Sequence, residues 1–224
     1  MKFNNRMIAN TCLSAALALG TVGTVLAQEA AVGVKLGTPG VGVEVSTPIV
    51  GQLNGRLGIN YFSYEDTQNV TDIDYDIDAR LLTVSALLDW HPLNNGLRFS
   101  AGLFYNGNEA TVKSKDTGAV DIGNQTFNLT PGDRLTGDID FNRLAPYLGI
   151  GWGQYFGQKG HWSVLFDLGV MFQGSANVDL TAEGVLAGNP LLNSALQQEE
   201  DDLQDKADDY QYYPVIALGV SYRF

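Results

Sequence analysis

The feature that most constrains this chain is a two-residue alternation of apolar side chains whose apolar side carries no charge. In the last stretch, every second residue from Ile216 to Phe224 is aliphatic or aromatic. The same alternation runs from Trp162 to Phe172, from Leu144 to Trp152 and from Leu82 to Trp90. Successive side chains of a β-strand point to opposite faces, so this period predicts strands with one strongly apolar face.

The opposite faces of these strands carry glycine, small polar residues and charges. A Lys or Arg on the lipid side of a membrane barrel costs about 2–4 kcal/mol at mid-depth. Apolar strand faces without any charge are therefore typical of a membrane barrel that turns them toward lipid. The reverse arrangement would overfill the narrow interior of an eight-stranded barrel, whereas Gly, Ala and Ser fit it. We therefore expect the glycine-rich face to line the interior.

Breaks in the alternation divide the chain into eight strands, an even number as in single-chain outer-membrane barrels. Short connections alternate with mostly long ones, as periplasmic turns alternate with extracellular loops. Aromatic residues such as Trp90 and Trp152 stand beside the short connections, and Tyr61 and Tyr105 stand near the long ones. The sequence predicts an all-β fold, an eight-stranded antiparallel up-and-down transmembrane β-barrel. The expected breaks are 38–40, 48–51, 65–72, 91–96, 108–137, 153–160 and 181–209.

The first residues have the pattern of a secretory signal peptide. Lys2 and Arg6 precede an apolar stretch from Leu13 to Val25, and small or apolar residues stand before the cleavage site. We expect residues 1–27 to be cleaved and residues 28–224 to form one β-barrel domain in the bacterial outer membrane. The single Cys lies within the expected signal peptide, so a disulfide framework is excluded.

Composition and motifs exclude several classes of function. With 25 acidic and 13 basic residues and a net charge of −12, the chain lacks the clustered cations of a nucleic-acid binder. The sequence has no phosphate loop, dinucleotide motif or metal-ligand cluster, so we expect no cofactor and no metal. His161 and Ser163 share a strand face without a neighbouring carboxylate, so we expect no catalytic residue and no enzyme. A lipid-modifying enzyme is a remote alternative.

Three stretches carry a resemblance to a known family: Ala145–Gly151, Gly169–Leu180 and Tyr212–Val215. In them the chain resembles the CarO family of small outer-membrane proteins. The resemblance implies an OmpA-type eight-stranded barrel without a peptidoglycan-binding domain. It also implies a porin or channel for small solutes, such as ornithine and other basic amino acids. The final strand, with Tyr222 and Phe224, is similar to the C-terminal signal that the barrel-assembly machinery recognises.

Charged residues on the interior faces are the first candidate site. Because a short turn joins the fourth and fifth strands, we expect Asp89 to face Arg98, with Arg56 and Arg223 at a similar depth near the periplasmic mouth. Glu44, Arg143 and Asp167 are expected to form a second layer nearer mid-depth. One interpretation is a charged constriction that selects solutes. The other is a salt-bridged plug that fills the lumen and closes it.

Acidic residues in the expected outer loops are the second candidate site. The patch contains Glu199, Glu200, Asp201 and Asp202, and a shorter acidic run spans Asp72 to Asp78. The stretch 189–207 is expected to form a helix with Asn189 as its cap and Pro190 at its first position. The patch would attract cationic solutes, bind divalent ions between lipopolysaccharide phosphates, or be a solvated loop.

These observations give two main hypotheses of function. The first is a CarO-like channel that assists passage of small solutes, including cationic ones. The second is a non-conducting structural barrel whose acidic loops bind lipopolysaccharide or an external partner. Under both hypotheses the expected partners are outer-membrane lipid, lipopolysaccharide and the barrel-assembly machinery.

Overall fold

A computed structural model describes residues 29–70, 73–114, 118–122, 125–157, 159–207 and 210–224. The predicted signal peptide, residues 1–27, lies outside these described residues, as does Asp72 of the shorter acidic run. In the described part of the chain, no helix is both long enough and apolar enough to cross a membrane.

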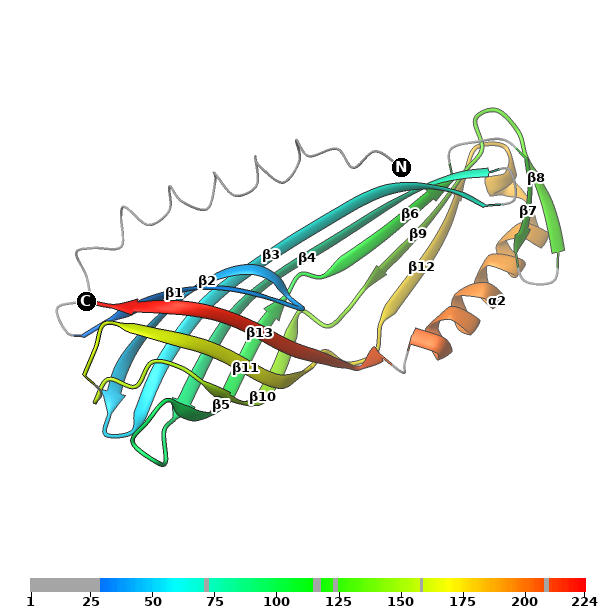
Figure 1. Ribbon diagram of the computed structural model, residues 1–224. Helices are drawn as coiled ribbons and strands as arrows, with labels where there is room; N and C mark the ends of the chain where they lie inside the picture. Colours follow the sequence, from blue (N-terminus) through cyan, green and yellow to red (C-terminus); the bar gives the residue numbers. More distant parts are fainter. Residues whose placement is uncertain (1–28, 71–72, 115–117, 123–124, 158, 208–209) are drawn as a thin grey trace.

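Eight antiparallel strands close into a barrel, which confirms the predicted fold (Figure 1). The barrel closes where the first strand, β1, pairs with the last strand, β13, and β4 pairs with β6 beyond the barrel as well as with β5 within it. Each strand pairs with the next along the wall, in the up-and-down order that the alternation predicts. The barrel strands are β1 (Ala31–Gly37), β2 (Gly40–Val50), β3 (Leu53–Val70), β4 (Ile73–Trp90), β5 (Leu97–Asn106), β10 (Leu144–Trp152), β11 (Trp162–Phe172) and β13 (Tyr212–Arg223).

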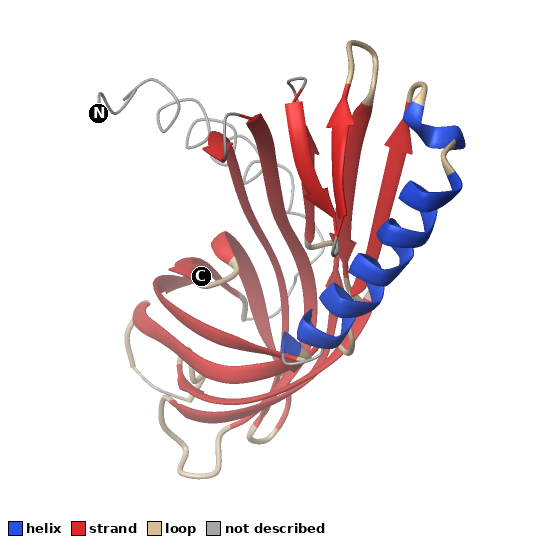
Figure 2. Cartoon of the chain, turned by 90° about the vertical axis from the view of Figure 1, so that its right-hand side faces the viewer, coloured by secondary structure: helices blue, strands red, loops and turns tan. Residues whose placement is uncertain are grey.

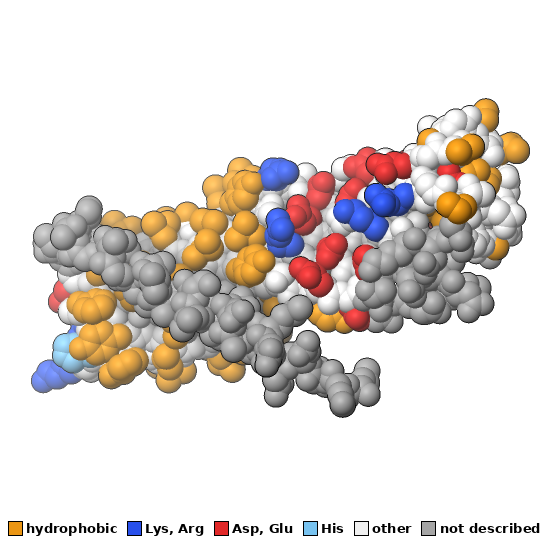
Figure 3. All heavy atoms as spheres, turned by 90° about the horizontal axis from the view of Figure 1, so that it is seen from above, with side chains coloured by type: hydrophobic (Ala, Val, Ile, Leu, Met, Phe, Trp, Pro, Cys, Tyr) orange, Lys and Arg blue, Asp and Glu red, His pale blue; other side chains and the backbone are white. Residues whose placement is uncertain are grey.

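The predicted apolar faces form the outside of the barrel. Leu57, Leu148 and Leu218 are each more than half exposed, on three different strands. Their neighbours along the chain point inward and are buried, such as Arg56 and Ala217. Hydrophobic side chains gather over the barrel end of the molecule in Figure 3. A broad apolar outer wall of this kind is stable against hydrocarbon and not against water.

Strands β3 and β4 continue far beyond the barrel. Each has 18 residues, which span about 60 Å at about 3.4 Å per residue, more than twice the apolar band of an outer membrane. Beside them lie β6 (Glu109–Ser114), β9 (Arg134–Asp140) and β12 (Asn177–Glu183), which extend one wall into an extracellular sheet. The loops expected at 65–72 and 108–137 were therefore wrong as loops, because β3 continues to Val70 and β6 to β9 lie between Glu109 and Asp140. The break at 181–209 contains the end of β12 and the predicted helix.

The polarity of the strands inverts in this extracellular sheet. Its outer face carries charged residues such as Arg80, Glu109 and Asp138, and acidic and basic side chains gather beyond the hydrophobic barrel region in Figure 3. Its inner face carries apolar residues such as Val112 and Val178, as in a soluble sheet that covers a core. The inversion places the boundary between membrane and water near the ends of the barrel strands.

A small lobe forms at the tip of the extended sheet. It consists of the hairpin β7 (Gly118–Ile122) and β8 (Gln125–Leu129), the short helix η2 (Leu186–Gly188) and the helix α2 (Pro190–Ala207), which lies beside the edge strand β12 (Figure 2). Its core contains Ile122, Phe127, Leu192, Ala195 and Leu196. The predicted helix and its cap are confirmed, since Leu191 N–H donates to Asn189 Oδ1 at 3.0 Å.

Candidate functional site

Among the residues that the structure describes, six charged side chains lie in the interior of the barrel, one from each of six strands. Each occupies an inward position, since the alternation turns its apolar neighbours toward lipid. All six are at most 8% exposed. We call them the luminal charge cluster: Lys35 on β1, Glu44 on β2, Arg56 on β3, Asp89 on β4, Arg98 on β5 and Asp167 on β11.

Arg56 is the centre of this cluster and contacts carboxylates on three strands. Its Nε lies 2.8 Å from Asp89 Oδ2. Its Nη1 lies 3.2 Å from Glu44 Oε2 and 3.0 Å from Asp167 Oδ2. Because β3 and β11 are on opposite walls, the guanidinium of Arg56 bridges the full width of the lumen. Ser100 completes the contacts, since its hydroxyl donates to Asp89 and accepts from Arg56 Nη2 at 3.2 Å.

The cluster is electrically balanced. Arg98 Nη2 lies 2.8 Å from Asp167 Oδ1, and Lys35 Nζ lies 3.0 Å from Glu44 Oε2. The six residues thus provide three cations and three carboxylates, with a net charge of zero. A buried charge without a partner costs several kcal/mol, so complete pairing allows these groups to stay ionised in a lumen that excludes them from water.

Two further layers fill the lumen on the extracellular side of the cluster. The first is apolar, with Leu87, Phe104, Ala145, Tyr147, Met171 and Val215 in mutual contact. The second is polar, where Asn60 Nδ2 donates to Thr83 Oγ1 at 2.9 Å and Asn106 Nδ2 donates to Gln173 Oε1 at 3.4 Å. The side chains of all three layers are buried, so the interior is packed along most of its length.

The ring of Tyr147 lies inside the barrel over a pair of glycines on β10 and β11. Gly149 on β10 and Gly169 on β11 face each other across the strand pair. A Cβ atom at either position would overlap the Tyr147 hydroxyl. The absence of side chains there makes the space that the phenol ring fills, which explains why this inward face carries glycine at both positions.

Five of the seven predicted luminal residues come together: Glu44, Arg56, Asp89, Arg98 and Asp167. They form one cluster and not two layers. Lys35 also belongs to it, although the sequence did not single it out as a site residue. The available signal was that Lys35 is the one charge on β1 and stands diagonally opposite Glu44 in the β1–β2 pair.

Two predicted members do not join the luminal charge cluster. Arg143 is exposed, and its Nη1 donates to the Tyr105 hydroxyl at 3.0 Å on the outer wall. The chain leaves β9 and re-enters the barrel as β10 at this point, so the alternation that placed Arg143 inside does not hold there. Arg223 lies at the end of β13, where its Nη1 donates to Phe156 O at 2.9 Å in a periplasmic turn.

The predicted pairing of Asp89 with Arg98 was also inexact. Asp89 stands opposite Ser100 in the β4–β5 pair, two residues further along β5. The two charges still approach, with Arg98 Nη1 at 3.6 Å from Asp89 Oδ2, because a long arginine side chain reaches its diagonal neighbour.

The predicted acidic patch lies on α2. Glu200 faces β12, where its Oε1 accepts the Leu180 N–H at 2.6 Å. Asp201 and Asp202 are exposed and Glu199 is half-buried. At the other end of the molecule, Tyr222 contacts the rings of Trp162 and Phe224, and Phe224 is 73% exposed. The assembly signal predicted for Tyr222 and Phe224 stays a prediction.

The remaining candidates for catalysis do not form a catalytic arrangement among the described residues. His161 Nδ1 lies 2.9 Å from Arg223 O, and its ring stacks on Tyr222. His91 is buried in the β4–β5 turn, where it contacts Asn54 Nδ2 and Asn95 O. Both histidines thus hold turns at the periplasmic end.

Two solved structures have the same architecture over nearly their whole length. The chain is similar to CarO2 of Acinetobacter baumannii, with a TM-score of 0.57, 21% sequence identity, and coverage of 88% of this chain and 99% of that one. It is also similar to Acinetobacter baumannii CarO, with a TM-score of 0.55, 26% identity, and coverage of 87% and 97%. The chain is a CarO-like small outer-membrane β-barrel protein.

No protein-family model and no curated protein matches the sequence. The likeness to the CarO structures places this CarO-like barrel in the outer membrane. The architecture of the barrel is therefore shared with the CarO structures.

Proposed function

We propose that this CarO-like barrel has a lumen closed to solutes and that its function is to anchor the extracellular sheet and lobe in the outer membrane. The observation that carries the proposal is the contact of Arg56 with Glu44, Asp89 and Asp167 across the lumen. A solute passing through would have to separate several buried charge pairs and then displace the apolar layer around Tyr147. This is the plug interpretation of the interior charges.

The lobe is the part of the molecule that such an anchor would hold outside the membrane. Strands β6, β9 and β12, which lie beside the long β3 and β4, carry it beyond the apolar wall, and its own core is separate from the lumen. A rigid barrel that supports an exposed binding surface is a frequent arrangement, because the scaffold fixes the loops that make contact. We therefore also propose that the lobe binds a partner outside the cell.

Single-channel recording on the refolded chain in planar bilayers tests the closed lumen. We expect no conductance steps at any holding voltage at which an open porin, recorded in the same bilayers, conducts. An Arg56→Ser/Tyr147→Ser variant removes the bridging side chain and the ring above it, and we expect it to conduct. Discrete steps from the unaltered chain would contradict the proposal.

A second candidate function is the passage of small solutes, including cationic ones. The ionic composition of the lumen favours it, since apolar residues of similar volume would seal a barrel without desolvating six charges. Under this candidate, the luminal charge cluster rearranges to a hydrated constriction that selects by charge. Liposome swelling with ornithine, compared with a neutral amino acid of similar size, tests it. Equal rates with and without the protein would contradict this candidate.

A further inference from the structure

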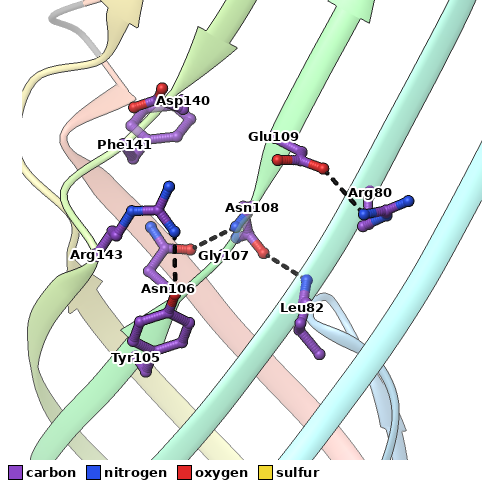
Figure 4. A pocket seen from close by; sticks show the side chains of 10 residues that line it. All are labelled: Arg80, Leu82, Tyr105, Asn106, Gly107, Asn108, Glu109, Asp140, Phe141 and Arg143. Carbon is purple, nitrogen blue, oxygen red and sulfur yellow. Dashed lines mark hydrogen bonds and ion pairs between the residues drawn. The ribbon is translucent and has the colours of Figure 1, made fainter.

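A small cavity opens on the outer wall of the barrel at the level where the strands leave the membrane. Its volume is about 160 Å³. It lies where β5 continues into β6 and where β9 continues into β10, at an interruption of the regular pairing between these strands. Arg80, Tyr105, Asn108, Phe141 and Arg143 are among the residues that line it (Figure 4).

The cavity lies at the boundary between apolar and charged surface. On its membrane side stand outward apolar residues, Leu103 and Leu144, which are exposed on the barrel wall. On its extracellular side, Arg80, Glu109 and Asp140 lie in one row across three strands. Lipid headgroups lie at this height, with acyl chains below them and water above.

Of the two arginines that line the cavity, Arg143 is hydrogen-bonded to a neutral side chain. Its Nη1 donates to the Tyr105 hydroxyl, and no ion pair joins it to a carboxylate among the described residues. Arg80 differs, because its Nη1 lies 3.2 Å from Glu109 Oε1. Figure 4 shows the two arginines on either side of the cavity, Arg143 beside Tyr105 and Arg80 beside Glu109. Most of the donor groups of Arg143 are therefore available to an anion.

We propose that this cavity binds a phosphate group of an outer-leaflet lipopolysaccharide molecule, with Arg143 as its main ligand. A guanidinium matches a phosphate through two parallel N–H···O hydrogen bonds. Tyr105 holds the guanidinium at the edge of the cavity, and the exposed leucines below it offer a surface to an acyl chain. The lipid would then be recognised at both its phosphate and its chain.

The carboxylates at the cavity limit which anions bind there. Glu109 and Asp140 stand opposite each other in the β6–β9 pair, and with Arg80 and Arg143 the charged side chains at the cavity sum to zero. Because the net charge at the cavity is zero, long-range electrostatic attraction does not raise the concentration of free anions there. Binding depends on the oriented donors of Arg143 and on contact of the lipid with the wall. This predicts preference for a lipid phosphate over inorganic phosphate.

Native mass spectrometry of the refolded full chain in detergent, titrated with lipid A, tests the site. Arg143→Gln removes the charge at an exposed position, and we expect affinity to fall about tenfold, the usual effect of one charge-assisted contact. Tyr105→Phe keeps the aromatic ring but frees the guanidinium, and we expect a smaller loss. Arg134→Gln is the matched control, since this exposed arginine lies in the extracellular sheet beside Glu183, and we expect unchanged affinity.

Three results would overturn the proposal. Equal lipid A affinity of Arg143→Gln and the unaltered chain would exclude Arg143 as a ligand. Equal binding of lipid A stripped of its phosphates would exclude phosphate recognition. Full competition by inorganic phosphate would show a simple anion site and not a lipid site. None of these results depends on whether the lumen conducts, so the test is independent of the proposed function.

Discussion

The Arg56 guanidinium lies 3.0 Å from the carboxylate of Asp167, a residue 111 positions away in sequence and on the opposite wall of the barrel. Three strands separate β3 from β11 in either direction around the wall. The contact is therefore a cross-link through the lumen and not a contact between neighbouring strands. It joins the N-terminal and C-terminal halves of the barrel by a charge pair that water does not reach.

Asp167→Asn is expected to lower the free energy of unfolding by about 3–5 kcal/mol, the usual cost of removing one partner from a buried charge pair. The substitution keeps the shape of the side chain but leaves Arg56, Arg98 and Lys35 with only two carboxylates. Urea titration in detergent, followed by the electrophoretic mobility of the folded barrel, measures the change. Glu183→Gln at the exposed pair with Arg134 is the control, and we expect no measurable change there.

Asp89→Ala and Arg98→Ala separate a plug from a gate. Each single variant leaves a buried charge unpaired, so we expect each to unfold at lower urea concentration. The double variant restores neutrality, and we expect it to lose less stability than the sum of the two. If the single variants kept full stability but altered the conductance, the cluster would instead act as a gate.

The barrel was predictable from sequence because lipid imposes a strict rule on the outer face. A charged residue in place of Leu57, Leu148 or another outward residue would be costly in lipid. The apolar alternation is therefore uninterrupted, and the barrel strands can be predicted from it. The inner face follows the opposite rule, and its charges identified most of the luminal charge cluster. Register was less predictable, since the β4–β5 turn places Asp89 opposite Ser100 and no residue of the turn indicates this offset.

The extracellular sheet was not predictable from the same rule. Its strands turn charge outward and apolar residues inward, so β6 and β9 lack the continuous apolar face of a membrane strand. The same change of rule misplaced Arg143, which stands where β9 gives way to β10. The cavity beside it depends on an interruption of strand pairing, a feature formed by residues 106–108 and 141–143 together and encoded in neither alone.

Gly169→Ala is expected to destabilise the barrel by about 1–3 kcal/mol, the usual cost of overpacking a filled interior. The added methyl group would overlap the Tyr147 hydroxyl. A Tyr147→Phe change in the same chain removes that hydroxyl, and we expect it to restore part of the lost stability. Gly188→Ala adds a methyl group in open space and serves as the control. A Gly169→Ala barrel as stable as the control would contradict this packing.

Glu200→Ala is expected to loosen the edge of the extracellular sheet. Glu200 accepts the Leu180 N–H of the edge strand β12, and an unsatisfied N–H at this position costs about 1–3 kcal/mol. Hydrogen exchange at the Leu180 amide should accelerate, while Asp201→Ala, at an exposed position on the same helix, should leave it unchanged. Equal exchange in both variants would indicate that the acidic patch is only a solvated surface.

The lobe is expected to loosen in acid because of Asp133. Its Oδ2 accepts the Thr130 hydroxyl and the Thr130 N–H, and its Oδ1 accepts the Leu186 N–H at 3.0 Å. The Thr130 hydroxyl contributes most, and together these donors lower the pKa of Asp133 from 3.8 to about 2. The unfolded turn therefore binds a proton more readily, so the stability that Asp133 contributes is complete above about pH 4 and is lost as the pH falls toward about 2.

Amide chemical shifts of Thr130 and Leu186, followed by NMR during an acid titration in detergent micelles, measure this directly. Both amides should titrate together with a midpoint near the lowered pKa of about 2. Asp133→Asn should abolish the titration, because the amide side chain keeps an acceptor oxygen but does not ionise. A midpoint at the ordinary value of 3.8 would mean that the carboxylate does not hold η2 to the β8–β9 turn in solution.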